Sequence, residues 1–165
     1  MMITLRQRLT ILVLTAGIIV ALDQATKYLV VHYLTSRVVI IPGLVDMVRV
    51  YNRGIAFGMF NSGQCLFRTT VLTILSVAVF VILFAAYLFS KDMTRLSMAA
   101  LSLIMGGAVG NLIDRIRLGY VVDFIDAYIR SAHWPAFNVA DSAITVGAIL
   151  LAIDLLFSGH SKKQP

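Results

Sequence analysis

The chain has 165 residues, of which 59% are hydrophobic and 13% are charged. A mean hydropathy of +0.90 excludes a soluble globular protein, and the length indicates a single membrane domain over residues 1–165. The formal net charge of +6 is expected to reflect topology and contact with membrane lipid, since the sequence has no arginine-aromatic pattern typical of nucleic-acid binding. We therefore expect membrane lipid around this chain and no nucleic-acid partner.

Four apolar segments predict four transmembrane helices, at about residues 10–31, 69–89, 96–113 and 142–157. A helix needs roughly 20 residues to cross the hydrocarbon. The last two segments are short, so we expect them to begin or end against protein. The first follows basic residues as a signal peptide does, but no cleavage site follows, so we expect a retained helix.

Basic residues predict the orientation. An even number of helices puts both termini on one side of the membrane. Lysine and arginine are dense at the termini and in the short loop after the second helix, whereas the connections at about 32–68 and 114–141 are much longer. The positive-inside rule therefore predicts cytoplasmic termini and places the two long connections on the outer face.

A polar segment, Asp23-Gln24-Ala25-Thr26-Lys27, lies at the outer end of the first helix. Asp23 and Lys27 are four residues apart, so they share a helix face and can form an ion pair. This is either an interfacial pair with Lys27 extending outward to water or a polar anchor for an active region.

The first long connection predicts a small β-sheet on the outer face, with a loop or helix beside it. Two apolar runs, 38–41 and 45–51, flank Pro42-Gly43 and are typical of a hairpin. The segment 52–58 follows, and its glycines permit unusual backbone conformations. It is either an ordinary loop or a place where an extended peptide pairs with the main chain.

The third helix ends in a polar face. Gly106 and Gly110 have the spacing that lets another helix approach closely. Asn111, Asp114 and Arg115 follow on one side of the helix. Asp114 or Asn111 could hold Arg115, or all three could be solvated.

Two aspartates stand out among eight acidic residues, all of them aspartate. Asp123 is embedded between Val122 and Phe124, where burial would raise its pKa. Asp141 opens the last helix and is either a helix cap or a functional carboxylate. The connection between them has both ends at one membrane face, so the two can meet and share a proton for acid–base chemistry. Asp154 lies at the other end of the last helix, and we interpret it as structural.

Together these segments resemble the lipoprotein signal peptidases, the signal peptidase II family of bacteria. The matching motifs, in chain order, are Asp23-Gln24-x-Thr26-Lys27, Asn52-x-Gly54-x-Ala56-Phe57, Gly110-Asn111-x-x-Asp114-Arg115, Gly119-x-Val121-x-Asp123-Phe124 and Phe137-Asn138-x-Ala140-Asp141-Ser142. Arg53 and Ile55 depart from the family pattern. The resemblance implies an aspartyl endopeptidase of the inner membrane. It would cut a diacylglyceryl-modified prolipoprotein immediately before the lipidated cysteine.

The resemblance also implies roles for individual residues. Asp123 and Asp141 would be the catalytic pair. Other residues would line or support the site, with Asp23 and Lys27 behind them; the lining residues are Asn52, Gly54, Asn111, Arg115, Asn138 and Ala140. We expect a monomer without a cofactor. We also expect no metal, because the three histidines lack ligand spacing.

Two other functions remain open at this point. A small proton-coupled transporter also uses intramembrane aspartates. It predicts carboxylates deep within the helices and internal repeats, and the sequence shows neither convincingly. A non-catalytic scaffold predicts that neutral variants of Asp123 and Asp141 keep function.

Overall fold

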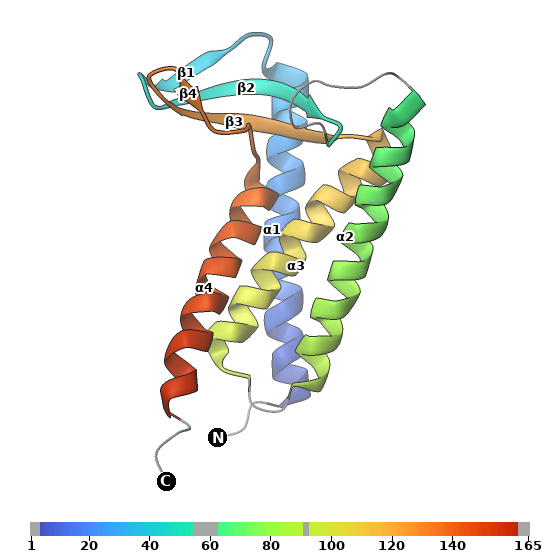
Figure 1. Cartoon of the computed structure of the whole chain (residues 1–165), viewed down its shortest axis with the longest axis vertical. Helices are drawn as coiled ribbons and strands as arrows, with labels where there is room; N and C mark the ends of the chain where they lie inside the picture. Colours follow the sequence, from blue (N-terminus) through green and yellow to red (C-terminus); the bar gives the residue numbers. More distant parts are fainter. Residues whose placement is uncertain (1–3, 55–62, 91–92, 162–165) are drawn as a thin grey trace.

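The computed structural model describes residues 4–54, 63–90 and 93–161. Helices and strands follow one another in the order shown in Figure 1, with the bounds α1 Leu5–Tyr33, β1 Val38–Ile41, β2 Val45–Asn52, α2 Gly63–Phe89, α3 Arg95–Leu118, β3 Val121–Ile129, β4 Ala132–His133 and α4 Val139–Ser161.

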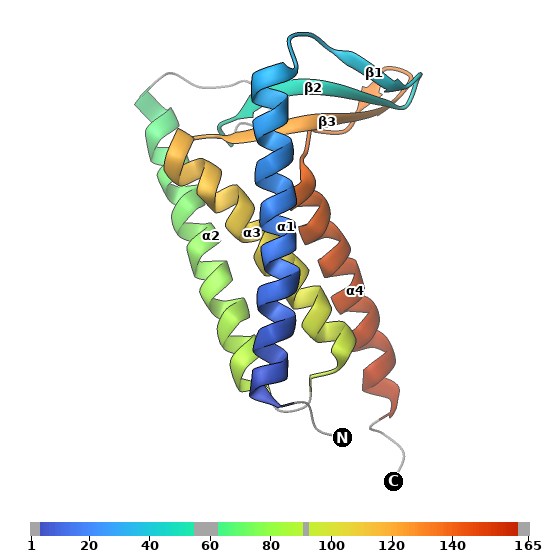
Figure 2. The same cartoon turned by 180° about the vertical axis from the view of Figure 1, so that it is seen from behind.

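The four helices form a bundle, and the strands form a sheet across one end of it (Figures 1 and 2). Each helix contains a stretch long and apolar enough to cross a membrane, in agreement with the predicted count. The start of α1 and the end of α4 lie at the end of the bundle away from the sheet (Figure 1). The predicted fold class, four membrane helices with a small sheet, is confirmed.

Helix α3 is the central helix of the bundle. About 56% of its most apolar window is buried, against 6% for α2 and 11% for α1. The exposed apolar side chains of α1 and α2 therefore suit a lipid environment, because no other part of the described chain covers them. Thr94 caps the start of α3, and Gly119 ends it with a left-handed backbone (φ 77°) that glycine adopts without strain.

The sheet is antiparallel, with strand order β1-β2-β3-β4. The predicted hairpin is present as β1 and β2, with Val38 opposite Met47. The sequence did not predict β3, although it pairs with β2 and places Val50 opposite Asp123. Residues 121–124 of β3 are all buried. Such a strand carries no alternation of apolar and polar residues, so the usual pattern is missing.

The last two helices are longer than the apolar segments that predict them. α3 continues five residues beyond 113, to Leu118, and α4 begins at Val139. Polar residues near the predicted end of α3, such as Asn111 and Asp114, suggest that the helix leaves the membrane there. Both are instead buried inside the protein, so the helices continue to the sheet.

Buried polar groups at the opposite end of the bundle hold helix termini. Arg8 of α1 donates hydrogen bonds to the carbonyl oxygens of Tyr87 and Ser90, where α2 ends. Asp154 of α4 accepts hydrogen bonds from the Thr94 and Ser97 hydroxyls, at the start of α3. These contacts fit the structural role expected for Asp154.

Candidate active site

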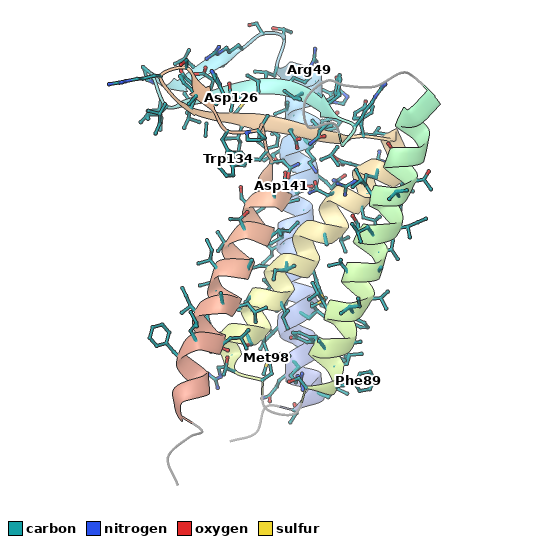
Figure 3. All side chains as sticks on the ribbon, viewed as in Figure 1. Arg49, Phe89, Met98, Asp126, Trp134 and Asp141 are labelled. Atoms are coloured by element: carbon teal, nitrogen blue, oxygen red, sulfur yellow. The ribbon has the colours of Figure 1, made fainter. Side chains whose placement is uncertain are left out.

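The structure brings Asp123 and Asp141 together beneath the sheet. Asp141 lies in the first turn of α4, just below the strands, whereas Asp126 and Arg49 lie at the level of the sheet (Figure 3). Asp123 comes from β3, and only 1% of its surface is exposed. The two carboxylates therefore approach each other from a strand and from a helix start.

Asn138 connects the two aspartates directly. Its side-chain amide donates to Asp123 Oδ1 at 2.7 Å. Its Oδ1 accepts from the backbone N–H of Asp141 at 2.9 Å, and its own N–H donates to Asp141 Oδ2 at 3.3 Å. This reciprocal pattern is a capping box in which Asn138 is the cap. The interpretation of Asp141 as the cap is therefore wrong, because Asp141 stands three residues further on.

Two more amides donate to the same carboxylates. Asn111 of α3 donates to Asp141 Oδ1 at 2.7 Å, and Asn52 at the end of β2 donates to Asp123 Oδ2 at 2.8 Å. The other side of the Asn52 amide accepts from the N–H of Gly54 at 2.8 Å. Gly54 has φ 78°, a conformation that glycine readily adopts. Asn52 and Gly54 are exposed, so they mark the open side of the site.

The surroundings of Asp123 alter its acidity. Burial, and to a smaller extent the charge of Asp141, raise the pKa of Asp123, whereas the hydrogen bonds from Asn52 and Asn138 and the charge of Lys27 lower it; the net effect is a pKa of about 6. A carboxyl with this pKa holds or releases a proton close to neutral pH. Beside a second carboxylate, it is suited to general acid–base chemistry.

Lys27 is buried behind the aspartate pair. Its Nζ lies 2.8 Å from Asp23 Oδ2, 2.9 Å from Asp114 Oδ2 and 3.0 Å from Asn111 Oδ1. Only 3% of Lys27 and none of Asp23 is exposed. The alternative in which Lys27 reaches outward to water is therefore wrong.

Asp114 was not among the predicted site residues. Two signals in the sequence could have identified it: it lies three residues after Asn111 on α3, and it belongs to the motif Gly110-Asn111-x-x-Asp114-Arg115.

The first turn of α4 packs tightly against α3 and α1. The N–H of Ala140 donates to Asp23 Oδ1 at 3.0 Å. A Cβ atom at Gly110 would stand 2.6 Å from Asp23 Oδ2, and one at Gly107 would overlap the carbonyl oxygen of Ala140. Both glycines are therefore required for this approach. Of the predicted pair, Gly110 lies at this contact, whereas a Cβ atom at Gly106 would stand 2.9 Å from the Cα of Ala16 in α1.

Arg115 is half-buried but is not held as expected. Its guanidinium donates to the Ser76 hydroxyl of α2 at 3.4 Å, whereas Asp114 and Asn111 bind Lys27. Its charge nevertheless interacts across space with both Asp123 and Asp141. Arg115 therefore adds a positive charge to the side of the site facing α2.

The parts of the chain that the structure describes contain no group of three or more His, Cys, Asp or Glu side chains that could hold a metal ion. Of the predicted site residues, all ten are described. The neighbouring motif residues Ile55, Ala56 and Phe57 lie outside the described residues.

A family model described as signal peptidase (SPase) II matches residues 15–157. The chain belongs to the signal peptidase II family. It is 46% identical over 143 residues to the lipoprotein signal peptidase of Solibacter usitatus, covering 86% of this chain and 87% of that protein. It is 39% identical to the lipoprotein signal peptidase of Syntrophus aciditrophicus, covering 92% of this chain and 96% of that protein.

Solved structures agree with the family. A bacterial membrane enzyme structure determined in meso at 2.3 Å resolution is 32% identical, with a TM-score of 0.80, and the match covers 93% of this chain and 92% of that chain. A second such structure, at 1.9 Å, has a TM-score of 0.78. The resemblance found in the sequence is thereby confirmed, and the chain is a multi-pass bacterial membrane protein of a protease family.

Proposed function

We propose that this chain is an aspartyl endopeptidase that removes signal peptides from diacylglyceryl-modified prolipoproteins. It cuts immediately before the lipidated cysteine, and Asp123 and Asp141 are its catalytic residues. The observation that carries this proposal is the bridging of the two carboxylates by Asn138, with a side-chain amide donor on each.

The chemistry needs one proton shared between the two carboxylates. Like charges in close proximity disfavour double ionisation, so one member keeps its proton. The ionised member takes a proton from a water molecule, whose oxygen then attacks the scissile carbonyl carbon. The protonated member donates to the carbonyl oxygen. Because the two titrate as a pair, neither role is assigned to a single aspartate.

Collapse of the tetrahedral intermediate completes the reaction. The C–N bond breaks, the amino group of the lipidated cysteine takes a proton from the pair, and the signal peptide leaves with a new carboxylate. The bilayer supports positioning, because diacylglyceryl chains anchored in lipid hold the scissile bond near the membrane surface. Asn52 and Gly54 lie on the open side of the site and Arg115 lies on the side facing α2, and from these positions they would contact the peptide.

The proposed orientation puts both termini in the cytoplasm and the aspartate pair at the outer face of the inner membrane. Arg6, Arg8 and Arg95 lie at the end of the bundle away from the sheet, in agreement with the positive-inside rule. A reporter fused after Lys163 should be cytoplasmic, and an exported reporter would invert this topology.

The alternative of a proton-coupled transporter finds no support. The relatives are named lipoprotein signal peptidases, and the two aspartates meet at one end of the bundle. A transporter would require carboxylates along a path through the membrane.

The test uses purified protein and a diacylglyceryl-modified prolipoprotein, with products identified by mass. We expect cleavage immediately before the lipidated cysteine and no cleavage of the unmodified precursor. Asp123→Asn and Asp141→Asn should each lose at least about 10³-fold in rate, because general acid–base contributions reach 10²–10⁴. Full turnover by either variant would exclude the catalytic pair. A metal chelator should leave the rate unchanged.

A further inference from the structure

The ammonium group of Lys27 has three N–H donors, and three acceptors lie within hydrogen-bond distance of it. They are Asp23 Oδ2 at 2.8 Å, Asp114 Oδ2 at 2.9 Å and Asn111 Oδ1 at 3.0 Å. Each acceptor makes a further contact with the aspartate pair or with a residue next to it. Lys27 itself contacts neither aspartate.

The first contact runs through Asn111. Because a lysine ammonium only donates, the Asn111 oxygen must face Lys27. The Asn111 NH₂ then faces Asp141 Oδ1, to which it donates at 2.7 Å. A reversed amide would place its oxygen against the carboxylate. Lys27, together with the Asn138 amide that donates to the same oxygen at 3.2 Å, therefore determines which end of Asn111 meets Asp141.

The second contact runs through Asp114. The same Oδ2 that binds Lys27 accepts from the backbone N–H of Val122 at 3.1 Å, and Oδ1 accepts from the Gln24 side chain at 2.9 Å. Val122 directly precedes Asp123 in β3. Asp114 therefore holds the strand beside the first aspartate.

The third contact runs through Asp23, whose Oδ1 accepts from the backbone N–H of Ala140 at 3.0 Å. Ala140 directly precedes Asp141. Asp23 therefore holds the first turn of α4 beside the second aspartate.

We propose that Lys27 is a positioning residue that aligns Asp123 and Asp141 through Asn111, Asp114 and Asp23. This inference rests on the proposed function. Lysine suits the role because its three donors diverge toward three side chains, Asp23 of α1 and Asn111 and Asp114 of α3, whereas the planar fork of arginine directs its donors differently. Lys27→Arg should therefore fail to restore the rate.

A purely structural ion pair would have a different effect. Loss of such a pair lowers stability but leaves the turnover of the folded protein unchanged. Loss of a positioning residue lowers kcat and leaves KM near its original value, because the peptide-facing residues stay in place. We expect Lys27→Met to lower kcat about 100-fold, the typical effect of displacing a catalytic group by about 1 Å.

The matched control is Arg8→Met, which removes another buried cation at the opposite end of the bundle. It should lower the melting temperature without changing kcat per folded molecule. An equal fall in kcat in both variants would overturn the proposal.

A double-mutant cycle tests the contact through Asn111. Asn111→Ala and Lys27→Met disrupt the same path to Asp141, so the double variant should lose less than the product of the two single losses. Strictly multiplicative losses would overturn the contact through Asn111.

A double variant keeps the proposal testable if Lys27→Met alone does not fold. The pair Lys27→Met with Asp114→Asn removes one positive and one negative buried charge together. We expect it to recover stability and not kcat. Recovery of kcat together with stability would show that Lys27 only balances charge.

The experiments distinguish failure of the proposed function from failure of the role proposed for Lys27. If the wild-type protein does not cleave the lipidated precursor, the proposed function fails. If the wild type cleaves, Asp123→Asn does not, and Lys27→Met keeps its kcat, only the role of Lys27 fails.

Discussion

The two ends of the helix bundle both bury ionisable side chains, but they bond them to different partners. Away from the sheet, Arg8 binds the backbone carbonyl oxygens where α2 ends, and Asp154 accepts hydroxyl donors at the start of α3. Beneath the sheet, Asp123 and Asp141 accept hydrogen bonds from the side-chain amides of Asn52, Asn111 and Asn138.

The difference in bonding partners distinguishes two reasons why a protein buries a charged side chain. Helix termini in a membrane must satisfy their backbone polar groups within the protein, so a charge bonded there has a structural explanation. Asp123 has no helix terminus to serve. Asp141 accepts one hydrogen bond from the Asn138 N–H at the start of α4, but the cap residue is Asn138, and the other oxygen of Asp141 accepts from the side chain of Asn111. The partners of a buried carboxylate therefore separate a structural group from a functional one better than its burial does.

The largest difference in cleavage rate is expected between variants of the two helix caps, one at each end of the bundle. Asn138 caps α4 and also contacts Asp123, whereas Thr94 caps α3 beside Asp154. Thr94→Ala should cost about 1 kcal/mol of stability and little activity. Asn138→Ala should cost a similar stability and also lower the cleavage rate at least about 100-fold, because Asp123 loses a donor and the backbone N–H of Asp141 loses the acceptor that fixes its position.

The measurement is the rate of prolipoprotein cleavage per folded molecule, with thermal unfolding of each variant alongside. Equal activity in the two cap variants would remove the distinction between the ends.

A smaller difference in kcat is expected between alanine variants of two glycines that lie at close helix contacts. A Cβ at Gly110 would stand 2.6 Å from Asp23 Oδ2, and one at Gly147 would stand 2.7 Å from the Ala100 carbonyl oxygen. Each alanine substitution should cost about 1–3 kcal/mol through overpacking. Only Gly110→Ala should also lower kcat, by about 10-fold, because a shift of Asp23 smaller than 1 Å displaces α4 beside Asp141. If Gly147→Ala lowers kcat as much, activity responds to bundle packing in general.

The smallest expected effect is a shift in the pH dependence of kcat/KM. The pKa of Asp123 is raised to about 6, mainly by burial, and the hydrogen bond from Asn52 stabilises the ionised form and so keeps the pKa from rising higher. Asn52→Ala removes this stabilisation, so the pKa rises and the shared proton is retained to higher pH. The alkaline limb of the kcat/KM profile should therefore move upward.

Asp126→Asn is the control for the pH profile. Asp126 lies on the same strand but pairs with His133, with 2.9 Å between His133 Nδ1 and Asp126 Oδ1. This substitution should leave the alkaline limb in place. A downward shift in Asn52→Ala would contradict the sign assigned to the Asn52 contact.

Local patterns predicted several parts of the molecule from the sequence. The hairpin from Val38 to Tyr51 follows from apolar runs around Pro42-Gly43, and the meeting of Asp123 with Asp141 follows from the even number of helices. Both depend on order along the chain, which a sequence contains directly.

Other features depend on contacts between distant segments and could not be predicted in this way. Lys27 is buried because Asn111 and Asp114, more than eighty positions away, surround its ammonium group. Arg115 turns toward Ser76 for the same reason, since its nearer candidate partners are already bound. Strand β3 was missed because burial of both its faces removes the alternating pattern.

The most direct test compares two aspartates of α4. Asp141 and Asp154 stand near opposite ends of this helix, and a purified Asn variant of each can be assayed for cleavage of the diacylglyceryl-modified prolipoprotein. Asp141→Asn should lose at least about 10³-fold in kcat, and Asp154→Asn should stay within about 3-fold of wild type once corrected for folded protein. Comparable activity in the two variants would contradict the assignment of the catalytic pair to the sheet end of the bundle.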